Sequence, residues 1–481
     1  MGKEYKRTLF LILCKAVHDL YPEGKLKIMF PVSNGYYCEL QVGEVLSPEI
    51  VADIRHRMRD IIKADLPIMA HKKPKEEVLK VFEGDASKTS LMESLDTKTL
   101  RYCSLDGYND TFYSEMLPST GGINLFGLEL YYNGMLLRVP DVNNPEKLGK
   151  FIRQDKMFDV FMASHRWQDR MGIGNVGTLN KAVEAGYSTQ LIAVFEAMQD
   201  KNLSKIADDI CSRRDVRVIL IAGPSSSGKT TTCKRLSVQL AVNGLYTKQL
   251  SMDDYYVDRE LSPRDEEGNY DFESIHALNL SLFNDQLNAL INGEEVELPR
   301  YNFKMGKSEK SGKTVRLEDN EVLVIEGIHA LNPELTAHIQ QRMVYRVYAS
   351  ALTSITLDDH NYIPTTDNRL IRRMVRDYKY RNSSAEDTLS RWTSVRRGED
   401  KWIFPYQENA DAVFNTALLF ELAVLKPQAE PLLAAVHKGS PVYDEAKRLR
   451  SLLRHVMPMS EKQIPPTSLL REFLGGSSFE Y

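Results

Sequence analysis

The chain has 481 residues, a net charge of −4 at pH 7, 42% hydrophobic residues and 27% charged residues. This composition is typical of a globular protein with more than one core, and it argues against nucleic-acid binding driven by bulk charge. The five cysteines are scattered and show no C-x-x-C spacing, which argues against a disulfide framework or a zinc knuckle. No apolar run approaches the roughly 18 residues of a membrane helix, so we expect a cytoplasmic protein.

Residues 1–145 are predicted to form an α+β domain. Asn133-Gly134 separates two apolar runs near the end of this segment, which is a strong signal for a β-hairpin. The other expected elements are helices over 8–20 and 48–64, strands over 26–30 and 35–40, and the two hairpin strands within 128–137.

Two runs in this segment, AVHDLYP (16–22) and KLKIMFPVSNGYY (25–37), together with the hairpin, resemble the second additional domain of threonyl-tRNA synthetases, which edits mischarged tRNA. The editing site of that family uses an H-x-x-x-H pair and a C-x-x-x-H pair. The corresponding positions here are Arg7 and Leu11, then Asp106 and Asp110. The resemblance therefore implies an editing fold whose metal ligands are absent, because two carboxylates without imidazole or thiolate partners do not make a zinc-type site.

Residues 146–212 are predicted to be a helical connector. The pattern indicates a helix around 158–170, a glycine-rich break over 172–177, and a helical stretch over 178–209 that is interrupted near Asn202. The spaced glycines could suggest a dinucleotide-binding loop, but no strand precedes them, which favours a simple connection.

The segment 223–230 (GPSSSGKT) fills every fixed position of the phosphate-loop pattern G-x-x-x-x-G-K-S/T. A β-branched apolar run, VRVILIA (216–222), precedes it, and a helical pattern over 230–243 follows it, as a phosphate loop requires. A Ser/Gly-rich turn would explain the glycines but needs neither Lys229, which would reach the terminal phosphates, nor Thr230, which would ligate Mg²⁺. The predicted ATP-binding residues are Gly223, Pro224, Ser225, Ser226, Ser227, Gly228, Lys229, Thr230 and Thr231.

Two further predicted strands, over 246–252 and 322–327, carry acidic residues at their ends: Asp253 follows the first and Glu326 closes the second. Ligands of open parallel sheets gather at the carboxyl ends of the strands, so both carboxylates are expected beside the nucleotide phosphates. Asp253 could then accept the proton of an attacking hydroxyl, with an acidic turn as the alternative, and Glu326 could meet the metal together with Thr230.

Aromatic and basic clusters complete this region. The runs 269–273 (NYDFE) and 298–303 (LPRYNF) lie outside obvious strands and are equally consistent with nucleoside contacts and with loop packing.

Predicted strands over 344–349 and 411–414 bracket a helix with arginines at i, i+3, i+4 and i+7. One arginine face without interleaved acids favours a lid over an anionic partner, with a solvated surface as the alternative. The basic residues are Arg369, Arg372, Arg373 and Arg376, with Lys379 and Arg381 beyond them.

Together, these motifs over residues 215–427 resemble the uridine kinase and phosphoribulokinase branch of P-loop kinases. The resemblance implies that Asp253 is the general base, that Glu326 is a metal-site acid, and that Arg373, Arg376 and Arg381 belong to a lid. One departure is Gly306, which stands where the family has a histidine on the uracil side. The substrate-binding residues predicted from the motifs and the resemblance are Asp253, Tyr256, Tyr270, Asp271, Tyr301, Phe303, Arg373 and Arg381.

The sequence thus predicts an α/β kinase domain over 213–427, with a parallel sheet flanked by helices, and a C-terminal helical extension over 428–481 with helices at 429–437 and 442–457. The expected activity is Mg²⁺-dependent phosphorylation of the 5′-hydroxyl of a pyrimidine ribonucleoside by ATP, uridine being the first candidate and cytidine the next. The alternative is an ATP-binding regulator associated with RNA or tRNA through the first domain; a homo-oligomer is compatible with either activity. The residues expected to act in catalysis are Asp253, Lys229, Arg373 and Arg376.

Overall fold

The computed structural model describes residues 2–113, 115–141, 144–264, 268–302 and 304–481. The chain forms two compact units, each built from three separate segments. Unit 1 comprises Met1–Thr189, Thr353–Asn368 and Leu422–Ser460, and unit 2 comprises Gln190–Leu352, Arg369–Glu421 and Glu461–Tyr481. These divisions differ from the consecutive domains predicted with boundaries at 145, 212 and 427, because each unit includes segments that are distant in sequence. Within the described residues, no helix combines the length and apolarity needed to cross a bilayer.

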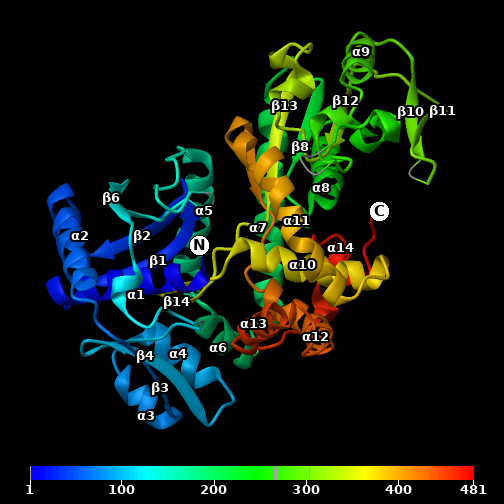
Figure 1. The fold of residues 1–481 in the computed structure, drawn as a ribbon. Helices are drawn as coiled ribbons and strands as arrows, with labels where there is room; N and C mark the ends of the chain where they lie inside the picture. Colours follow the sequence, from blue (N-terminus) through cyan, green and yellow to red (C-terminus); the bar gives the residue numbers. More distant parts are fainter. Residues whose placement is uncertain (1, 114, 142–143, 265–267, 303) are drawn as a thin grey trace. The chain divides into compact units, whose positions relative to one another are not determined.

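Unit 1 contains an antiparallel four-stranded sheet in the order β1-β2-β7-β6 (Figure 1). The predicted hairpin is confirmed: β6 and β7 pair from Tyr131↔Gly134 onward, and Tyr132 adopts a positive φ of 50° at the turn. Helix α1 contributes an unbroken buried run from Thr8 to Val17 to the core of this unit. The bounds are α1 (Lys3–Leu20), β1 (Lys25–Val32), β2 (Gly35–Gln41), α2 (Pro48–Lys63), β6 (Gly127–Tyr131) and β7 (Gly134–Arg138).

Further elements of unit 1 come from distant parts of the chain. A three-stranded sheet has the order β3-β4-β5, and the inserted segment 353–368 forms the short ribbon β14-β15. The predicted glycine-rich connection is confirmed, since Gly172 ends α5 with φ 68° and Asn175 caps α6. The bounds are β3 (Ile68–Pro74), α3 (Lys75–Val81), α4 (Ala86–Ser94), β4 (Thr99–Leu105), β5 (Tyr108–Asp110), α5 (Asp155–Met171), α6 (Val176–Glu184), β14 (Thr356–Asp358), β15 (Asn361–Tyr362), α12 (Glu421–Ala434) and α13 (Tyr443–Arg454).

The predicted helix interruption near Asn202 is wrong, because α7 (Ser188–Ser212) runs through that residue without a break. The interruption lies earlier, between α6 and α7, where Gly186 adopts a φ of 86°. A glycine in this conformation ends a helix at little steric cost, whereas Asn202 remains in the helical conformation inside α7.

Unit 2 contains a parallel five-stranded sheet in the order β16-β13-β8-β12-β9, which confirms the predicted α/β class. All residues of β8 are buried, as expected for a central parallel strand that is covered on both faces. The bounds of the strands are β8 (Val218–Ala222), β9 (Tyr246–Ser251), β12 (Glu321–Glu326), β13 (Val344–Ser350) and β16 (Ala412–Asn415). Its helices are α7, α8 (Lys229–Val242), α9 (Leu280–Ile291), α11 (Ala385–Trp402), α14 (Arg471–Leu474) and α10 (Thr365–Tyr380), the last from Arg369 onward.

The hairpin of β10 (Val296–Asn302) and β11 (Lys307–Val315) extends unit 2 beside α9 (Figure 1). The run 298–303 was expected to lie outside strands. This is wrong for residues 298–302, which belong to β10. Its partner β11 has the sequence KSEKSGKTV, which is polar and mostly exposed, so no apolar alternation marks this pair in the sequence. Phe303 lies outside the described residues.

Candidate active site

The segment 223–230 forms a loop that joins the carboxyl end of β8 to the first turn of α8. Gly223 is required here because a Cβ atom at this position would lie 2.0 Å from the carbonyl oxygen of Ala349. Gly228 adopts a φ of 85° and immediately precedes α8. The side-chain oxygens of Ser226 and Ser227 are buried without a hydrogen-bond partner in the part of the chain that the structure describes. The loop therefore offers unpaired donors and a helix N-terminus, which suits an anion such as phosphate.

The two residues predicted to hold the metal lie together. The Thr230 hydroxyl donates to both carboxylate oxygens of Glu326, each at 3.0 Å. Burial raises the pKa of Glu326, although Lys229 and this hydrogen bond oppose the shift. Burial likewise lowers the pKa of Lys229, against the charges of Glu326, Glu472 and Glu399. A hydroxyl and a carboxylate oxygen beside the phosphate loop are suitable ligands for Mg²⁺.

Asp253 lies directly after β9, in a short 3₁₀ helix (Met252–Tyr255). Asp253 is exposed to solvent. The protein atoms around its carboxyl group nevertheless displace part of the hydrating water, and this desolvation raises the pKa of the carboxyl. The neighbouring charge of Asp254 adds to this shift and the charge of Lys229 opposes it. Because β8, β12 and β9 are parallel neighbours, the phosphate loop, Glu326 and Asp253 follow or close three adjacent strands at the same edge of the sheet.

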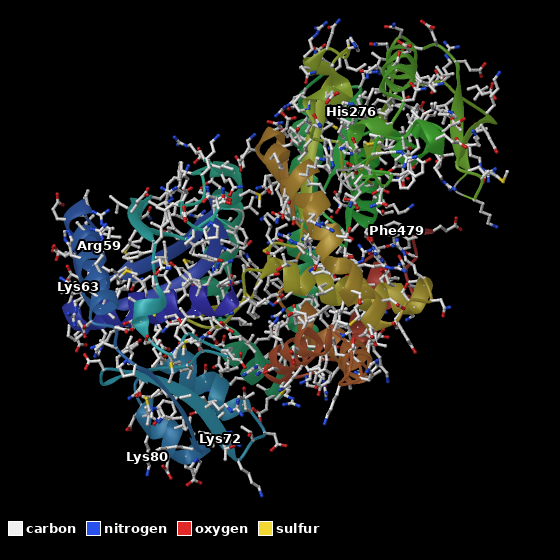
Figure 2. The ribbon with its side chains drawn as sticks, viewed as in Figure 1. Arg59, Lys63, Lys72, Lys80, His276 and Phe479 are labelled. Atoms are coloured by element: carbon white, nitrogen blue, oxygen red, sulfur yellow. The ribbon has the colours of Figure 1, made fainter. Side chains whose placement is uncertain are left out.

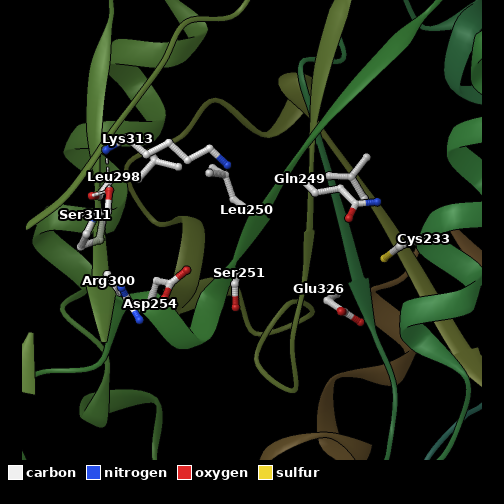
Figure 3. Close-up of a pocket in the computed structure, with 12 residues that line it drawn as sticks. Cys233, Gln249, Leu250, Ser251, Asp254, Leu298, Arg300, Ser311, Lys313 and Glu326 are labelled. Atoms are coloured by element: carbon white, nitrogen blue, oxygen red, sulfur yellow. Dashed lines mark hydrogen bonds between the residues drawn. The ribbon is translucent and has the colours of Figure 1, made fainter. Parts of the chain in front are cut away.

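A pocket of about 410 Å³ lies between this edge of the sheet and the β10-β11 hairpin (Figure 3). Its charged lining comes from Asp254, Arg300, Lys313 and Glu326, and only the last of these was among the predicted site residues. Lys313 was not predictable from the sequence, because its place in the pocket depends on the pairing of β10 with β11. The full lining is Cys233, Gln249, Leu250, Ser251, Asp254, Leu298, Pro299, Arg300, Ser311, Lys313, Val324 and Glu326.

The predicted aromatic substrate residues are only partly brought together. The rings of Tyr256 and Tyr301 lie 5.5 Å apart, and the Tyr256 hydroxyl donates to the carbonyl oxygen of Phe272 at 3.2 Å. Tyr270 packs instead under the guanidinium of Arg264, at 4.2 Å. The carboxylate of Asp271 lies 3.6 Å from Lys401 on α11.

The prediction that the arginine face of α10 lacks acidic partners is wrong. Arg369 and Arg372 are fully buried and form two-pronged ion pairs with Glu399 and Glu421. These acids come from later segments, so the sequence spacing along the helix could not reveal them. The two arginines therefore stabilise the interior of unit 2 and do not act as a mobile lid.

The three arginines predicted as lid residues share one acidic neighbour. Nitrogens of Arg373, Arg376 and Arg381 lie 3.3, 2.8 and 3.6 Å from carboxylate oxygens of Asp377. Arg373 also reaches the phosphate loop, where it donates to the hydroxyl of Ser225 at 2.5 Å. Burial lowers the pKa of Arg373 and of Arg381.

Glu399 and Thr416 hydrogen-bond to the backbone of the phosphate loop, and neither was predicted from the sequence. Glu399 accepts hydrogen bonds from the backbone N–H of Ser225 at 2.8 Å and from Arg369 at 2.6 Å. The Thr416 hydroxyl donates to the carbonyl oxygen of Ser227 at 2.5 Å. These buried contacts fix the backbone of the loop in one conformation.

The sequence also gave no signal for the contacts of the last segment of unit 2. Glu472 accepts a hydrogen bond from the Thr231 hydroxyl at 2.6 Å. The hydroxyl oxygen of Tyr481 lies 2.8 Å from the hydroxyl oxygen of Thr231. Leu469 packs on Gly228 so closely that a Cβ there would lie 2.8 Å from its methyl carbons. Residues 461–481 therefore contact the start of α8 directly.

Residues 218–419 match the model of the Phosphoribulokinase / Uridine kinase family. This region is a P-loop kinase domain. A uridine kinase of Halobacterium salinarum is 27% identical over 195 residues, which cover 40% of this chain and 77% of that protein. A uridine kinase of Staphylococcus aureus is 28% identical over 197 residues, which cover 41% of this chain and 86% of that protein. The kinase activity class predicted from the motifs is confirmed by these similarities: the domain is that of a phosphotransferase.

Among solved structures, a possible uridine kinase from Bacillus stearothermophilus is 24% identical and covers 41% of this chain and 88% of its own, with a TM-score of 0.25. The family match does not include residues 1–217.

Proposed function

We propose that the kinase domain transfers the γ-phosphoryl group of ATP to the 5′-hydroxyl of a pyrimidine ribonucleoside, with uridine preferred over cytidine. The observation that carries this proposal is the placement of the Thr230–Glu326 pair and Asp253 beside the phosphate loop, at the ends of three adjacent strands. The similarity to uridine kinases supports a nucleoside as the acceptor.

In this proposal each residue has one task. The loop amides and Lys229 hold the ATP phosphates, and Thr230 and Glu326 would hold Mg²⁺, which neutralises charge on the transferring group. Asp253 accepts the proton of the 5′-hydroxyl as the new O–P bond forms and ADP leaves. Arg373 donates a hydrogen bond to the hydroxyl of Ser225 in the loop. From there it stabilises the negative charge that develops on the oxygens of the transferring phosphoryl group.

The acceptor would lie between Asp253 and the β10-β11 hairpin. Tyr256 and Tyr301 offer ring surfaces for the nucleoside, and Asp271 is proposed to contact its sugar. The base side differs from the related kinases, because Gly306 has a φ of 68° and a Cβ there would lie 2.7 Å from the guanidinium of Arg259. A histidine does not fit at this position without moving Arg259, so we propose that Arg259 borders the base in its place.

The experiment that tests this function measures ATP consumption against ribonucleosides, deoxyribonucleosides, pantothenate and ribulose 5-phosphate. We expect turnover with uridine and cytidine that is lost in Lys229→Ala and retained in the matched control Lys234→Ala, five residues further along α8. Turnover confined to a phosphorylated sugar, or none with any acceptor, would refute the nucleoside assignment.

For residues 1–145 we propose the fold of the synthetase editing domain. One observation favours a second function, in RNA binding: exposed Lys72 and Arg101 lie directly opposite each other on β3 and β4. Like charges in this arrangement cost energy, which a bound polyanion would relieve. Figure 2 shows Lys72 and Lys80 on this part of unit 1, and Arg59 and Lys63 on α2.

Electrophoretic retardation of tRNA at several salt concentrations tests the RNA-binding function. Binding that weakens in Lys72→Glu/Arg101→Glu but not in the control Arg59→Glu/Lys63→Glu would support it. No retardation at physiological salt would exclude it.

A further inference from the structure

Three potential metal ligands from distant parts of the sequence meet inside unit 1. They are the thiol of Cys14 on α1, the carboxylate of Asp110 at the end of β5, and the imidazole of His360 between β14 and β15. One ligand atom of each lies within 4.8 Å of the other two. Cys14 is 3% exposed and Asp110 is fully buried. The expectation that Asp110 has no imidazole or thiolate partner is therefore wrong.

Hydrogen-bond donors orient both oxygens of the Asp110 carboxylate, and the imidazole of His360 contacts one of them. Its Oδ1 accepts from the backbone N–H of Thr111 at 2.7 Å and lies 2.7 Å from the ammonium of Lys88. Its Oδ2 lies 2.8 Å from Nδ1 of His360 and accepts from the Tyr108 hydroxyl at 2.9 Å. The first set holds the carboxylate in place, and the second oxygen faces the imidazole, as is usual for a metal-binding carboxylate with outer-shell support.

The position of His360 is also fixed. Its backbone N–H donates to Oδ1 of Asp358 at 2.9 Å, and Asn361 donates to the same oxygen at 2.7 Å. The neighbouring residue Asp359 accepts a hydrogen bond from the N–H of Ile28 on β1 at 2.7 Å. The imidazole is therefore presented by a segment that is tied to the sheet of unit 1, so that little further ordering is needed for it to act as a ligand.

The charges around the three ligands match those of one bound divalent cation. Lys88 lies between Asp110 and Asp358, so these three buried groups carry a net charge of −1. A thiolate at Cys14 would make this −2, which one divalent ion neutralises. Without an ion, a protonated His360 at 2.8 Å from Asp110 supplies the counter-charge; a dication takes over that role as it displaces the protons of His360 and Cys14.

We propose that Cys14, Asp110 and His360 bind one divalent transition-metal ion of the zinc class. Sulfur, nitrogen and oxygen donors together suit Zn²⁺ and do not suit Mg²⁺ or Ca²⁺, which take oxygen ligands. The 3% exposure of Cys14 keeps a substrate away from the thiol, which favours a structural metal over a thiol nucleophile. The ion would link α1, β5 and the inserted segment 353–368 within unit 1.

The test titrates the tag-free, reduced full-length protein with Co²⁺ in the absence of nucleotide and oxygen. We expect one ion per chain with a thiolate-to-cobalt charge-transfer band in the near ultraviolet, and displacement of that ion by Zn²⁺. An ion bound at Thr230 and Glu326 gives no such band, since its ligands are oxygens. Absence of the band in the wild-type protein would overturn the proposal.

Variants locate the site. Cys14→Ser should abolish the charge-transfer band, and His360→Gln should weaken Co²⁺ binding by about 100-fold or more. The controls are Cys233→Ser, whose thiol lines the kinase pocket, and His71→Gln on β3, and neither should change the titration. A band that survives in Cys14→Ser, or is lost in Cys233→Ser, would place the metal elsewhere.

A measurement on the wild-type protein covers the case in which Cys14→Ser does not fold. X-ray absorption at the zinc edge should show one sulfur neighbour at about 2.3 Å with nitrogen and oxygen neighbours at about 2.0 Å. A shell of oxygen and nitrogen alone would overturn the assignment of Cys14.

Discussion

Replacing Glu399 by glutamine should destabilise unit 2 strongly. The Glu399 carboxylate is 3% exposed and accepts hydrogen bonds from Ser225, from two nitrogens of Arg369 and from Arg396. Glutamine keeps the shape but removes the charge and turns one acceptor into a donor facing Arg369, whose side chain is 1% exposed. Breaking a buried ion pair in this way costs about 3–5 kcal/mol, a large part of a domain's usual stability of about 5–15 kcal/mol.

Tryptophan fluorescence during urea unfolding can measure this effect. Trp392, 5.3 Å from the Arg369 guanidinium, and Trp402 both lie on α11, so a Trp167→Phe background leaves reporters in unit 2 only. With an m-value of about 2 kcal/mol per M, the midpoint should fall by about 2 M. Asp400→Asn is the matched control, because that side chain is 61% exposed and pairs with Arg396 at the surface. An unchanged midpoint in Glu399→Gln would refute the reasoning.

The stability of unit 2 should also depend on pH through Glu399. Burial alone would raise its pKa, but Arg369, Arg396 and the Ser225 N–H outweigh this and hold the pKa below its usual value. A carboxylate with a lowered pKa in the folded state stabilises the protein above its unfolded pKa. That stability should therefore be lost as the pH falls through the folded pKa, and the loss should be smaller in Glu399→Gln.

Three further predictions concern catalysis and the acceptor site. Asp253→Asn should lower turnover by about 10²–10⁴-fold with little change in the Kd of ATP measured by calorimetry, and equal loss of both would contradict the role of base. Burial raises the pKa of Asp253 and the charge of Asp254 adds to this rise. Because the base acts when ionised, kcat/KM should fall at low pH, and Asp254→Asn should move that fall to lower pH; an unmoved profile would count against the assignment. Gly306→His should lower the melting temperature more than Gly312→His. Both glycines have a positive φ, but only Gly306 lies against Arg259. Equal decreases in melting temperature would show that this contact does not matter.

The parts of the site that depend on local sequence were predictable, and those that depend on long-range pairing were not. The phosphate loop follows from its own residues, because Gly223 and Gly228 serve backbone needs that the motif itself records. The buried partner of Arg369 is 30 positions away, and His360 lies 250 positions from Asp110. Side-chain periodicity is a local property, so it reports the face of a helix but not what another segment brings to it.

The interleaving of the two units has a consequence for synthesis on the ribosome. Unit 1 needs residues 353–368 and 422–460, so its first 189 residues emerge long before their partners exist. Unit 2 in turn includes residues 461–481, which are made after every segment of unit 1. Neither unit can complete its fold before its later segments have been made, and apolar surface such as the buried face of α1 remains open to chaperones and proteases until then.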